Sequence, residues 1–484
     1  GSVFITGYTD GDFNNQNNND TSELPYTSTD AFLSKVTSNG TIEWTNLFGT
    51  SEYDEALDIS IDIDGNVYVS GFISGLGAFL PPFQTNLIGI KESDYSFNNI
   101  PFKNDGFITK FNSRGDQEWT TVFQTGEDDE IFAIETDKNN DIYIAGHTFG
   151  DLESQLNNGS GDIFISKVNS KGEKQWTSLI GSDAQDTPTD LSITDDFIYV
   201  SGFTSGNLSE SINDNNYTNG FIMKLDKEGN TKWINQIDEG KYSIASSLEA
   251  HNDNSIYLGV NSGGDIALHN LNNKGEIIWS KIIGTDSSDS LSQLITDEQG
   301  YIYLAGYTEG NIDETQNNNG AKDIYINKLN SNGVIENSFL IGTKNDDISN
   351  SISIFEDSIY ITGYTSADFK TGETIASRDA FITTLDLSNK LNETINEELE
   401  DENIGDVIGR GYEDGGAITG TLITSDGEGS TNNILYSLGN TPPNSSYTWS
   451  SLGDDIYGEA AGDQSGQSVS LSSDGSIVAI GATG

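Results

Sequence analysis

The sequence predicts an all-β fold, a β-propeller of four-stranded blades, with seven blades as the favoured number. Three observations support this class. One short phrase recurs along the chain, a second phrase follows each copy of the first, and the tryptophans all fall at one position of the repeat. Self-similarity of this kind is typical of repeat architectures, in which each repeat is one supersecondary unit. A repeat with four short antiparallel strands is the unit of a propeller.

The first phrase alternates apolar and aromatic residues and ends in a small residue, a glycine and an aromatic residue. It reads VYVSGF from Val67, IYIAGH from Ile142 and IYITGY from Ile359. Such alternation, rich in β-branched and aromatic residues, predicts a strand. Its glycine is expected to let backbones approach closely or to form a bulge. The repeated glycines are Gly7, Gly71, Gly146, Gly202, Gly306 and Gly363, and Val260 stands at this position in a degenerate copy.

The second phrase reads DAFLSKV from Asp30 and DIFISKV from Asp162, and a turn then leads to a strand that carries a tryptophan. A four-stranded blade has two poorly covered faces, and stacking blades around an axis buries both. The large indole rings are therefore expected to fill the space between blades. The six tryptophans are Trp44, Trp119, Trp176, Trp233, Trp279 and Trp449.

A third phrase completes the period with alternating strands such as ALDISI from Ala56 and SISIF from Ser351. Asp64-Gly65 and other Asp-Gly, Asn-Gly or Lys-Gly pairs are signals of two-residue hairpins. The first and second phrases each occur seven times up to Leu385, which favours seven blades. The first blade then lacks its third-phrase strand and the seventh lacks an adjacent tryptophan strand, so closure of the ring needs strands from elsewhere.

Three regions follow from this pattern. Residues 1–388 are expected to form the propeller, and residues 389–447 an acidic linker with a short β-hairpin. Residues 448–484 repeat the order of the strands, and they either close the ring or begin a second repeat array. A surplus copy of the first phrase in this tail favours the second array. Because the chain starts and stops inside a repeat, we expect it to be a piece of a longer protein.

The order VYVSGF, DAFLSKVTSNGTIEW, LFGT and DISIDIDGN resembles the bacterial β-propeller repeats called SBBP, over about residues 1–388. The copy from Ile256 departs from the pattern, since Val260 replaces the glycine and Asn270 replaces the lysine. The segment from Gly453 is similar to integrin-like FG-GAP repeats, and GTLITSDGEG from Gly420 resembles cadherin-type or VCBS modules. These resemblances imply an extracellular or cell-surface multidomain protein of bacteria. They imply no single activity, because one fold hosts many functions.

Composition excludes several classes of function. The chain has 76 acidic and 22 basic residues and a net charge of −54, which repels nucleic-acid phosphates and disfavours contact with anionic membranes. The absence of cysteine rules out disulfides, a thiol nucleophile and thiolate metal sites. No apolar run is long enough for membrane insertion.

Catalytic residues are not apparent in the sequence, and we predict that the protein is not an enzyme. The three histidines, His147, His251 and His269, stand in no recognisable nucleophilic motif. His147 occupies the aromatic position of the first phrase, where we expect it to pack as tyrosine or phenylalanine does elsewhere.

No cofactor is firmly implied, and Ca²⁺ is the one candidate. Two short loops place carboxylates close together, Asp10 with Asp12 and Asp62 with Asp64. Oxygen-rich loops suit Ca²⁺, although Asp-Gly is also an ordinary hairpin turn. The sequence favours the turn, and diffuse screening of the negative charge by divalent cations is a further alternative.

Partner contacts are most readily placed in the loops after the first phrase, which vary most between copies. The longest insertion follows Ile73 and is apolar, with Phe83, Phe97 and Phe102. Loops on a rigid scaffold often carry binding sites, so this insertion is a candidate contact for a protein or a glycan. The alternative is that it packs over the edge of its own blade.

The sequence therefore predicts a non-catalytic, extracellular or cell-surface propeller module of a large bacterial protein, which serves adhesion, interaction or structural spacing. Two alternatives remain open. One is a carbohydrate-binding, lectin-like propeller, and the other is a glycan-processing enzyme built on a propeller.

Overall fold

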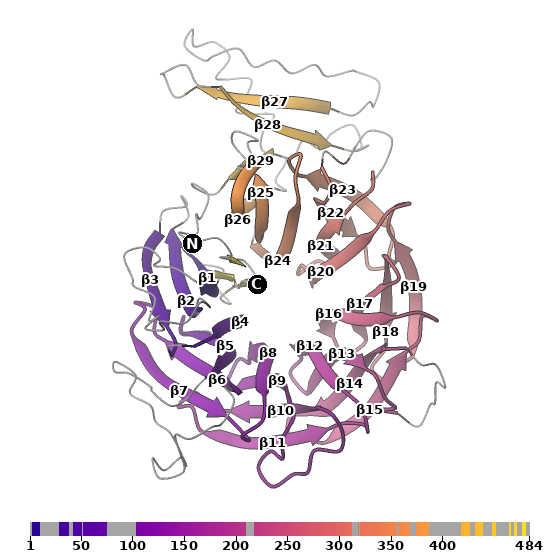
Figure 1. The fold of residues 1–484 in the computed structure, drawn as a ribbon. Coiled ribbons are helices and arrows are strands. Elements are labelled where there is room, and N and C mark those ends of the chain that lie inside the picture. Colours follow the sequence, from indigo (N-terminus) through magenta and orange to yellow (C-terminus); the bar gives the residue numbers. More distant parts are fainter. Residues whose placement is uncertain are drawn as a thin grey trace.

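The computed structural model describes most of the repeat region and parts of the tail. The described residues are 2–9, 29–37, 42–50, 52–74, 103–209, 217–311, 318, 320–355, 358–367, 374–386, 418–425, 431–438, 448–451, 464–465, 469–471 and 477–480. Over these ranges the fold is all-β, and seven sheets stand around a central axis as the blades of a propeller (Figure 1). The prediction of a seven-bladed β-propeller is confirmed.

One regular blade shows how the phrases map onto strands. β8 (Asp129–Thr136) carries the third phrase, β9 (Ile142–Thr148) the first, β10 (Asp162–Val168) the second and β11 (Lys174–Ile180) the tryptophan. The strands pair in this order, with β8 nearest the axis and β11 at the rim (Figure 1). Each repeat therefore forms one antiparallel blade.

Four further blades follow the same order. They are β4 (Asp54–Ile61), β5 (Val67–Ser74), β6 (Asn104–Phe111) and β7 (Gln117–Phe123); β12 (Asp186–Ile193), β13 (Phe197–Thr204), β14 (Asn219–Asp226) and β15 (Thr231–Ile237); β16 (Ser243–Asn252), β17 (Ser255–Ser262), β18 (Asp265–Leu271) and β19 (Ile277–Ile283); and β20 (Asp289–Thr296), β21 (Ile302–Thr308), β22 (Asp323–Leu329) and β23 (Ile335–Ile341). A hairpin of β27 (Ile418–Ser425) and β28 (Thr431–Leu438) extends the last of these at β23.

The two remaining blades take strands from the tail. β24 (Asp347–Phe355), β25 (Ser358–Ala367) and β26 (Thr374–Asp386) pair with β29 (Thr448–Ser451), which stands where other blades have their tryptophan strand. β1 (Ser2–Thr9), β2 (Asp30–Thr37) and β3 (Ile42–Phe48) are joined by β30 (Gln464–Ser465), β31 (Val469–Leu471) and β32 (Ile477–Ile480). β32 runs parallel to β1, whereas the innermost strands of the regular blades are antiparallel to their neighbours. The tail thus adopts the closing-strand arrangement in this structure.

The repeated glycine faces a bulge in the neighbouring inner strand. At Gly202 the register between β12 and β13 shifts between Pro188 and Asp190. A Cβ atom on Gly202 would overlap the carbonyl oxygen of Thr187 and come within 2.7 Å of the Phe221 ring. The other described copies behave alike, because a neighbouring carbonyl oxygen occupies the space of a Cβ atom at Gly71, Gly146, Gly306 and Gly363. Gly7 lies at the corresponding place in β1.

The apolar core lies between blades. One cluster combines Tyr68 and Phe123 of the β4–β7 blade with Ile144 and Phe164 of the β8–β11 blade, and all four side chains are buried. The rings of Phe123 and Phe164 stack with their centroids 5.5 Å apart. Because each sheet covers the face of the next, no blade buries its core alone.

Each tryptophan within the five fully described tryptophan strands packs against a turn of the following blade. The Trp119 ring lies against Gly172, whose φ is +81°, and its Nε1–H donates to the carbonyl oxygen of Ser170 at 3.2 Å. Two strand positions further on, the Thr121 hydroxyl donates to the Gly172 carbonyl oxygen at 2.7 Å. The same contact recurs in the pairs Trp44–Gly115, Trp176–Gly229, Trp233–Gly275 and Trp279–Gly333. Trp449 lies in β29, and its side chain is outside the described part of the structure.

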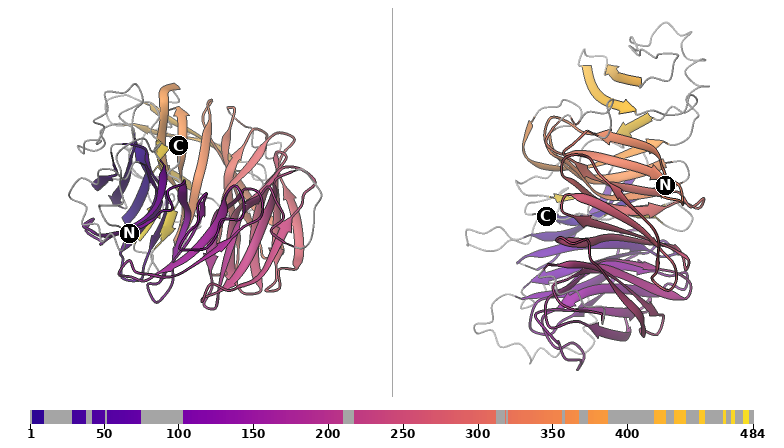
Figure 2. Two further views of the ribbon diagram at one scale, coloured as in Figure 1. Left: turned by 60° about the horizontal axis from the view of Figure 1, so that its bottom comes forward. Right: turned by 90° about the vertical axis from the view of Figure 1, so that its right-hand side faces the viewer.

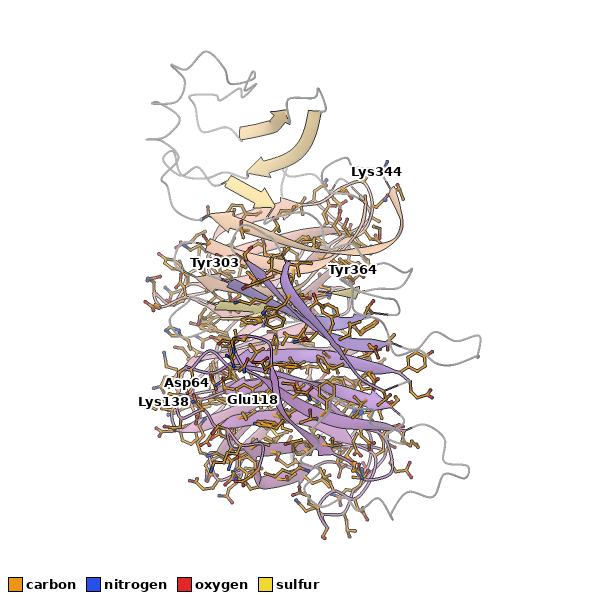
Figure 3. The ribbon with its side chains drawn as sticks, turned by 90° about the vertical axis from the view of Figure 1, so that its left-hand side faces the viewer. Asp64, Glu118, Lys138, Tyr303, Lys344 and Tyr364 are labelled. Atoms are coloured by element: carbon orange, nitrogen blue, oxygen red, sulfur yellow. The ribbon has the colours of Figure 1, made fainter. Side chains whose placement is uncertain are left out.

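The strands cross the thickness of the ring, which separates two kinds of connection (Figure 2). The hairpin turns that follow the third-phrase strands lie on one face, here called the turn face. The loops that lead from one blade into the next lie on the other, the loop face. Figure 3 shows Asp64 and Lys138 at the turn face and Lys344 at the loop face.

Candidate functional site

Pairs of aspartates occupy the junctions between blades on the loop face. The first aspartate lies at the start of the second-phrase strand, and the other begins the innermost strand of the following blade. The two are always 24 residues apart in the sequence. The pairs are Asp30 with Asp54, Asp105 with Asp129, Asp162 with Asp186, Asp265 with Asp289 and Asp323 with Asp347.

A backbone hydrogen bond between blades brings four of these five pairs together. The Asp186 amide donates to the carbonyl oxygen of Gly161, the residue before Asp162, at 2.9 Å. Because this bond holds the two strands together at the aspartates, the two carboxylates lie near each other. A Cβ atom on Gly49, for example, would touch the carboxylates of both Asp30 and Asp54. The same backbone bond joins Asp54 to Thr29, Ser243 to Thr218, Asp289 to Gly264 and Asp347 to Lys322.

A serine or threonine caps the second aspartate of each described pair. The Ser182 amide and hydroxyl donate to Asp186 Oδ2 at 2.6 and 2.8 Å. Thr285 makes the same two bonds to Asp289 Oδ2, at 2.5 and 3.0 Å. The loop between blades is therefore folded around this carboxylate. At Asp186 the bonds from Ser182 go to one of the two oxygens, whereas at Asp129 and Asp289 the threonine hydroxyl also reaches the other.

Nine of the ten carboxylates are buried, and only Asp265 is partly exposed. Burial raises the pKa of Asp105 to about 8, and the neighbouring carboxylate of Asp129 adds to the shift. Burial likewise raises the pKa of Asp129 to about 6 and that of Asp347 to about 6, although hydrogen bonds from nearby threonines lower both. For Asp54 burial moves the pKa well above its usual range. Two carboxylates in such a place can share a proton or hold a cation.

These shifts predict that stability falls as the pH rises. The unfolded chain releases the protons of Asp129 and Asp105 near pH 4, whereas the folded protein holds them to about pH 6 and about pH 8. Protonation therefore favours the folded state, and this stabilisation is lost as the pH rises from about 4 to about 8. For Asp129 the expected loss is at most about 3 kcal/mol. Melting in EDTA between pH 4.5 and 9 measures the trend, and Asp129→Asn should flatten it. A melting temperature that rises over this interval would contradict the assignment.

One junction lacks the carboxylates. Asn219 and Ser243 stand at the two positions, also 24 residues apart, and the Ser243 amide still donates to the Thr218 carbonyl oxygen at 3.0 Å. The backbone connection between blades therefore does not require the acids. This neutral junction is a natural comparison for the charged ones.

A second group of acids lies on the innermost strands. Burial raises the pKa of Glu249 to about 7 and that of Asp190 to about 6, and it moves the pKa of Glu135 well above the usual range. Asp190 Oδ2 accepts the Leu248 amide at 2.8 Å and the Ser247 hydroxyl at 3.0 Å. Asp190 therefore connects β12 to β16 around the axis.

The sequence-predicted metal residue Asp62 lies in a hairpin turn on the turn face. Its Oδ1 accepts the amides of Asp64 and Asn66 at 3.0 and 2.8 Å. Its Oδ2 accepts the Asn66 side-chain amide at 2.8 Å and the Tyr68 hydroxyl at 2.9 Å. Both oxygens of this buried carboxylate are occupied by the turn itself. Asp10 and Asp12 lie outside the described residues, as do Phe83, Phe97 and Phe102.

The histidines do not come together. His147 is buried between Phe132 and Phe149, with ring centroids 5.1 and 5.0 Å away, and burial lowers its pKa to about 4. His269 is buried beside Ser280, and His251 is exposed beside Thr296. Over the described ranges no group of three or more His, Asp or Glu side chains is arranged to hold a metal ion. In the same part of the chain there is no helix long and apolar enough to cross a membrane.

Sequence reasoning did not single out the paired aspartates. They stand at the edges of phrases that were interpreted as strands, and each pair spans two repeats. The constant interval of 24 residues was the available signal, because it persists while the spacing between repeats varies.

Comparison with known proteins adds little beyond the fold. No family model matches the chain. The regulatory protein FlaEY of Caulobacter vibrioides is 22% identical over 367 residues, which cover 73% of this chain and 34% of that protein. The chain thus spans about a third of the length of this curated relative. The SBBP and FG-GAP assignments stay predictions.

Solved structures that are similar at low identity include the following two. Prolyl oligopeptidase B from Galerina marginata matches at 9% identity with a TM-score of 0.38, over 74% of this chain and 47% of that chain. Puromycin hydrolase matches at 8% identity with a TM-score of 0.36, over 76% of this chain and 58% of that chain. Similarities this distant carry no argument about activity.

Proposed function

We propose that the chain is a non-catalytic propeller module of an extracellular or cell-surface bacterial protein, and that it binds a protein or glycan partner through its loop face. The observation that carries this proposal is a set of exposed aromatic side chains at one end of the blades. Each stands beside a strand end on the loop face. They are Tyr53, Phe149, Tyr217 and Tyr242.

Two of these aromatics stand together at the neutral junction. Tyr217 and Tyr242 each precede a residue of the Thr218–Ser243 backbone hydrogen bond, and they are 56% and 55% exposed. Exposed tyrosines offer large, rigid contact area with a polar tip, which suits recognition of proteins and sugars. The net charge of −54 keeps such a module soluble and favours partners that are neutral or basic.

The repeated polar residues support a structural rather than a catalytic use of the scaffold. The paired aspartates, the tryptophans and the turn residues are engaged in bonds within or between blades, as described above. A catalytic site needs groups that stand apart from the repeat, and a glycan-processing enzyme would need two carboxylates facing a shared cleft. The aromatics on the loop face favour the binding role over that alternative.

Binding assays on immobilised glycans and on bacterial surface proteins test the proposal. The wild-type module is expected to bind members of one set, and Tyr217→Ala/Tyr242→Ala to bind at least tenfold more weakly. The control is Ile278→Ala, which removes a 55% exposed side chain from the outer strand β19. Equal binding by the double variant, or turnover of a glycan substrate, would overturn the proposal.

A further inference from the structure

We propose that the Asp162–Asp186 pair is a Ca²⁺ site that joins two blades through the ion. The pair connects β10 of one blade with β12 of the next, on the loop face. This inference does not depend on the partner proposed above.

One oxygen of each carboxylate accepts no well-formed hydrogen bond from the described residues. Asp162 Oδ2 accepts the Asn158 amide at 2.8 Å, and Asp186 Oδ2 accepts the two bonds from Ser182. Among the described residues no group makes a hydrogen bond of acceptable geometry to Oδ1 of either aspartate. Both side chains are 0% exposed. An unpaired carboxylate oxygen in such a place is strongly unfavourable unless a proton or a cation satisfies it.

No basic side chain in the described ranges neutralises this pair. At the Asp265–Asp289 junction, in contrast, Lys241 Nζ approaches Asp265 Oδ2 to 3.5 Å. Burial raises the pKa of both acids at the Asp162–Asp186 junction. The negative charge of Asp186 adds to the shift of Asp162, and that of Asp183 adds to the shift of Asp186. A divalent cation would offset both the cost of burying these charges and the repulsion between them.

The chemistry of the surrounding groups suits Ca²⁺. The Thr204 hydroxyl on β13 points to Asp186, and its hydrogen bond lowers the pKa of that carboxyl. On ion binding this hydroxyl would turn its hydrogen away and offer a third oxygen. Ca²⁺ binds six to eight oxygens in flexible geometry and accepts water for the rest, whereas Mg²⁺ demands an octahedral set. Glycine at position 181 leaves room for the Asp162 carboxylate, which a Cβ atom would contact. The Asn219–Ser243 junction shows how the chain closes the same contact without charge.

Calorimetric titration of CaCl₂ into chelator-treated protein tests this site. Asp162→Asn/Asp186→Ser copies the neutral junction and is expected to bind one Ca²⁺ fewer per chain than the wild type. Asp183→Asn removes an exposed carboxylate from the same loop and should leave the stoichiometry unchanged. The reverse variant, Asn219→Asp/Ser243→Asp, is expected to bind one Ca²⁺ more and to melt at a lower temperature in EDTA than in Ca²⁺.

Each outcome decides the proposal. Loss of one ion in the first variant and gain of one in the reverse variant support it. Wild-type protein that binds no Ca²⁺ at millimolar concentration overturns it, as does an unchanged stoichiometry in the double variant. If that variant does not fold, the reverse variant alone decides. The proposal is then overturned if the reverse variant binds no additional Ca²⁺. Melting that depends on pH but not on Ca²⁺ would assign a shared proton to the pair instead.

Discussion

Valine in place of Gly202 is expected to destabilise the protein by about 3 kcal/mol or more, and to yield mostly misfolded material if the ring cannot adjust. The added side chain would overlap the Thr187 carbonyl oxygen and press on the buried Phe221 ring. The backbone of the bulge cannot yield without breaking the pairing of β12 with β13. Urea unfolding followed by tryptophan fluorescence measures the effect.

The matched control is Gly126→Ala. A Cβ atom on Gly126 meets nothing within 4 Å, and its φ of +96° leaves only the backbone cost of an L-residue, about 1 kcal/mol. If Gly202→Val were no more destabilising than this control, the close approach of the Thr187 carbonyl oxygen would not explain why glycine is required at position 202.

Alanine in place of Trp119 is expected to cost about 3–5 kcal/mol. The indole is 5% exposed, lies against Gly172 in the next blade and also contacts Tyr68 with ring centroids 5.9 Å apart. Its removal leaves a cavity and frees the Ser170 carbonyl oxygen. Thermal melting of the purified variant gives the size of the loss.

Trp119→Phe separates packing from hydrogen bonding. Phenylalanine keeps most of the ring but loses the bond to the Ser170 carbonyl oxygen, so a loss of about 1–2 kcal/mol is expected. A loss equal to that of Trp119→Ala would mean that the hydrogen bond, rather than the buried ring, carries the interaction.

Local patterns of the sequence were sufficient for the blades. The alternation in β9 identifies a strand, and Gly146 identifies its close approach to the neighbouring strand β8. Both features depend on contacts between residues close in sequence. The number of repeats then gave the number of blades. The tryptophans could be placed between blades because their position in the repeat is constant and a large ring gains most from burial there.

The candidate site depends on contacts that local patterns do not encode. Asp162 and Asp186 meet only because a backbone bond joins Gly161 to the next blade, which requires the stacked geometry. Asp62 looks like a metal ligand in sequence, yet its oxygens are consumed by the amides of its own turn. The surplus copy of the first phrase favoured a second array, whereas the tail strands pair with β1 and β26 in the structure, because one strand pattern serves both arrangements.

Hydrogen–deuterium exchange of Trp119→Ala tests most directly the claim that repeated residues join one blade to the next. Amides of both the β4–β7 blade and the β8–β11 blade are expected to lose protection together, since the indole belongs to the first and contacts the turn of the second. Loss of protection confined to β4–β7, with β10 and β11 as protected as in the wild type, would contradict it.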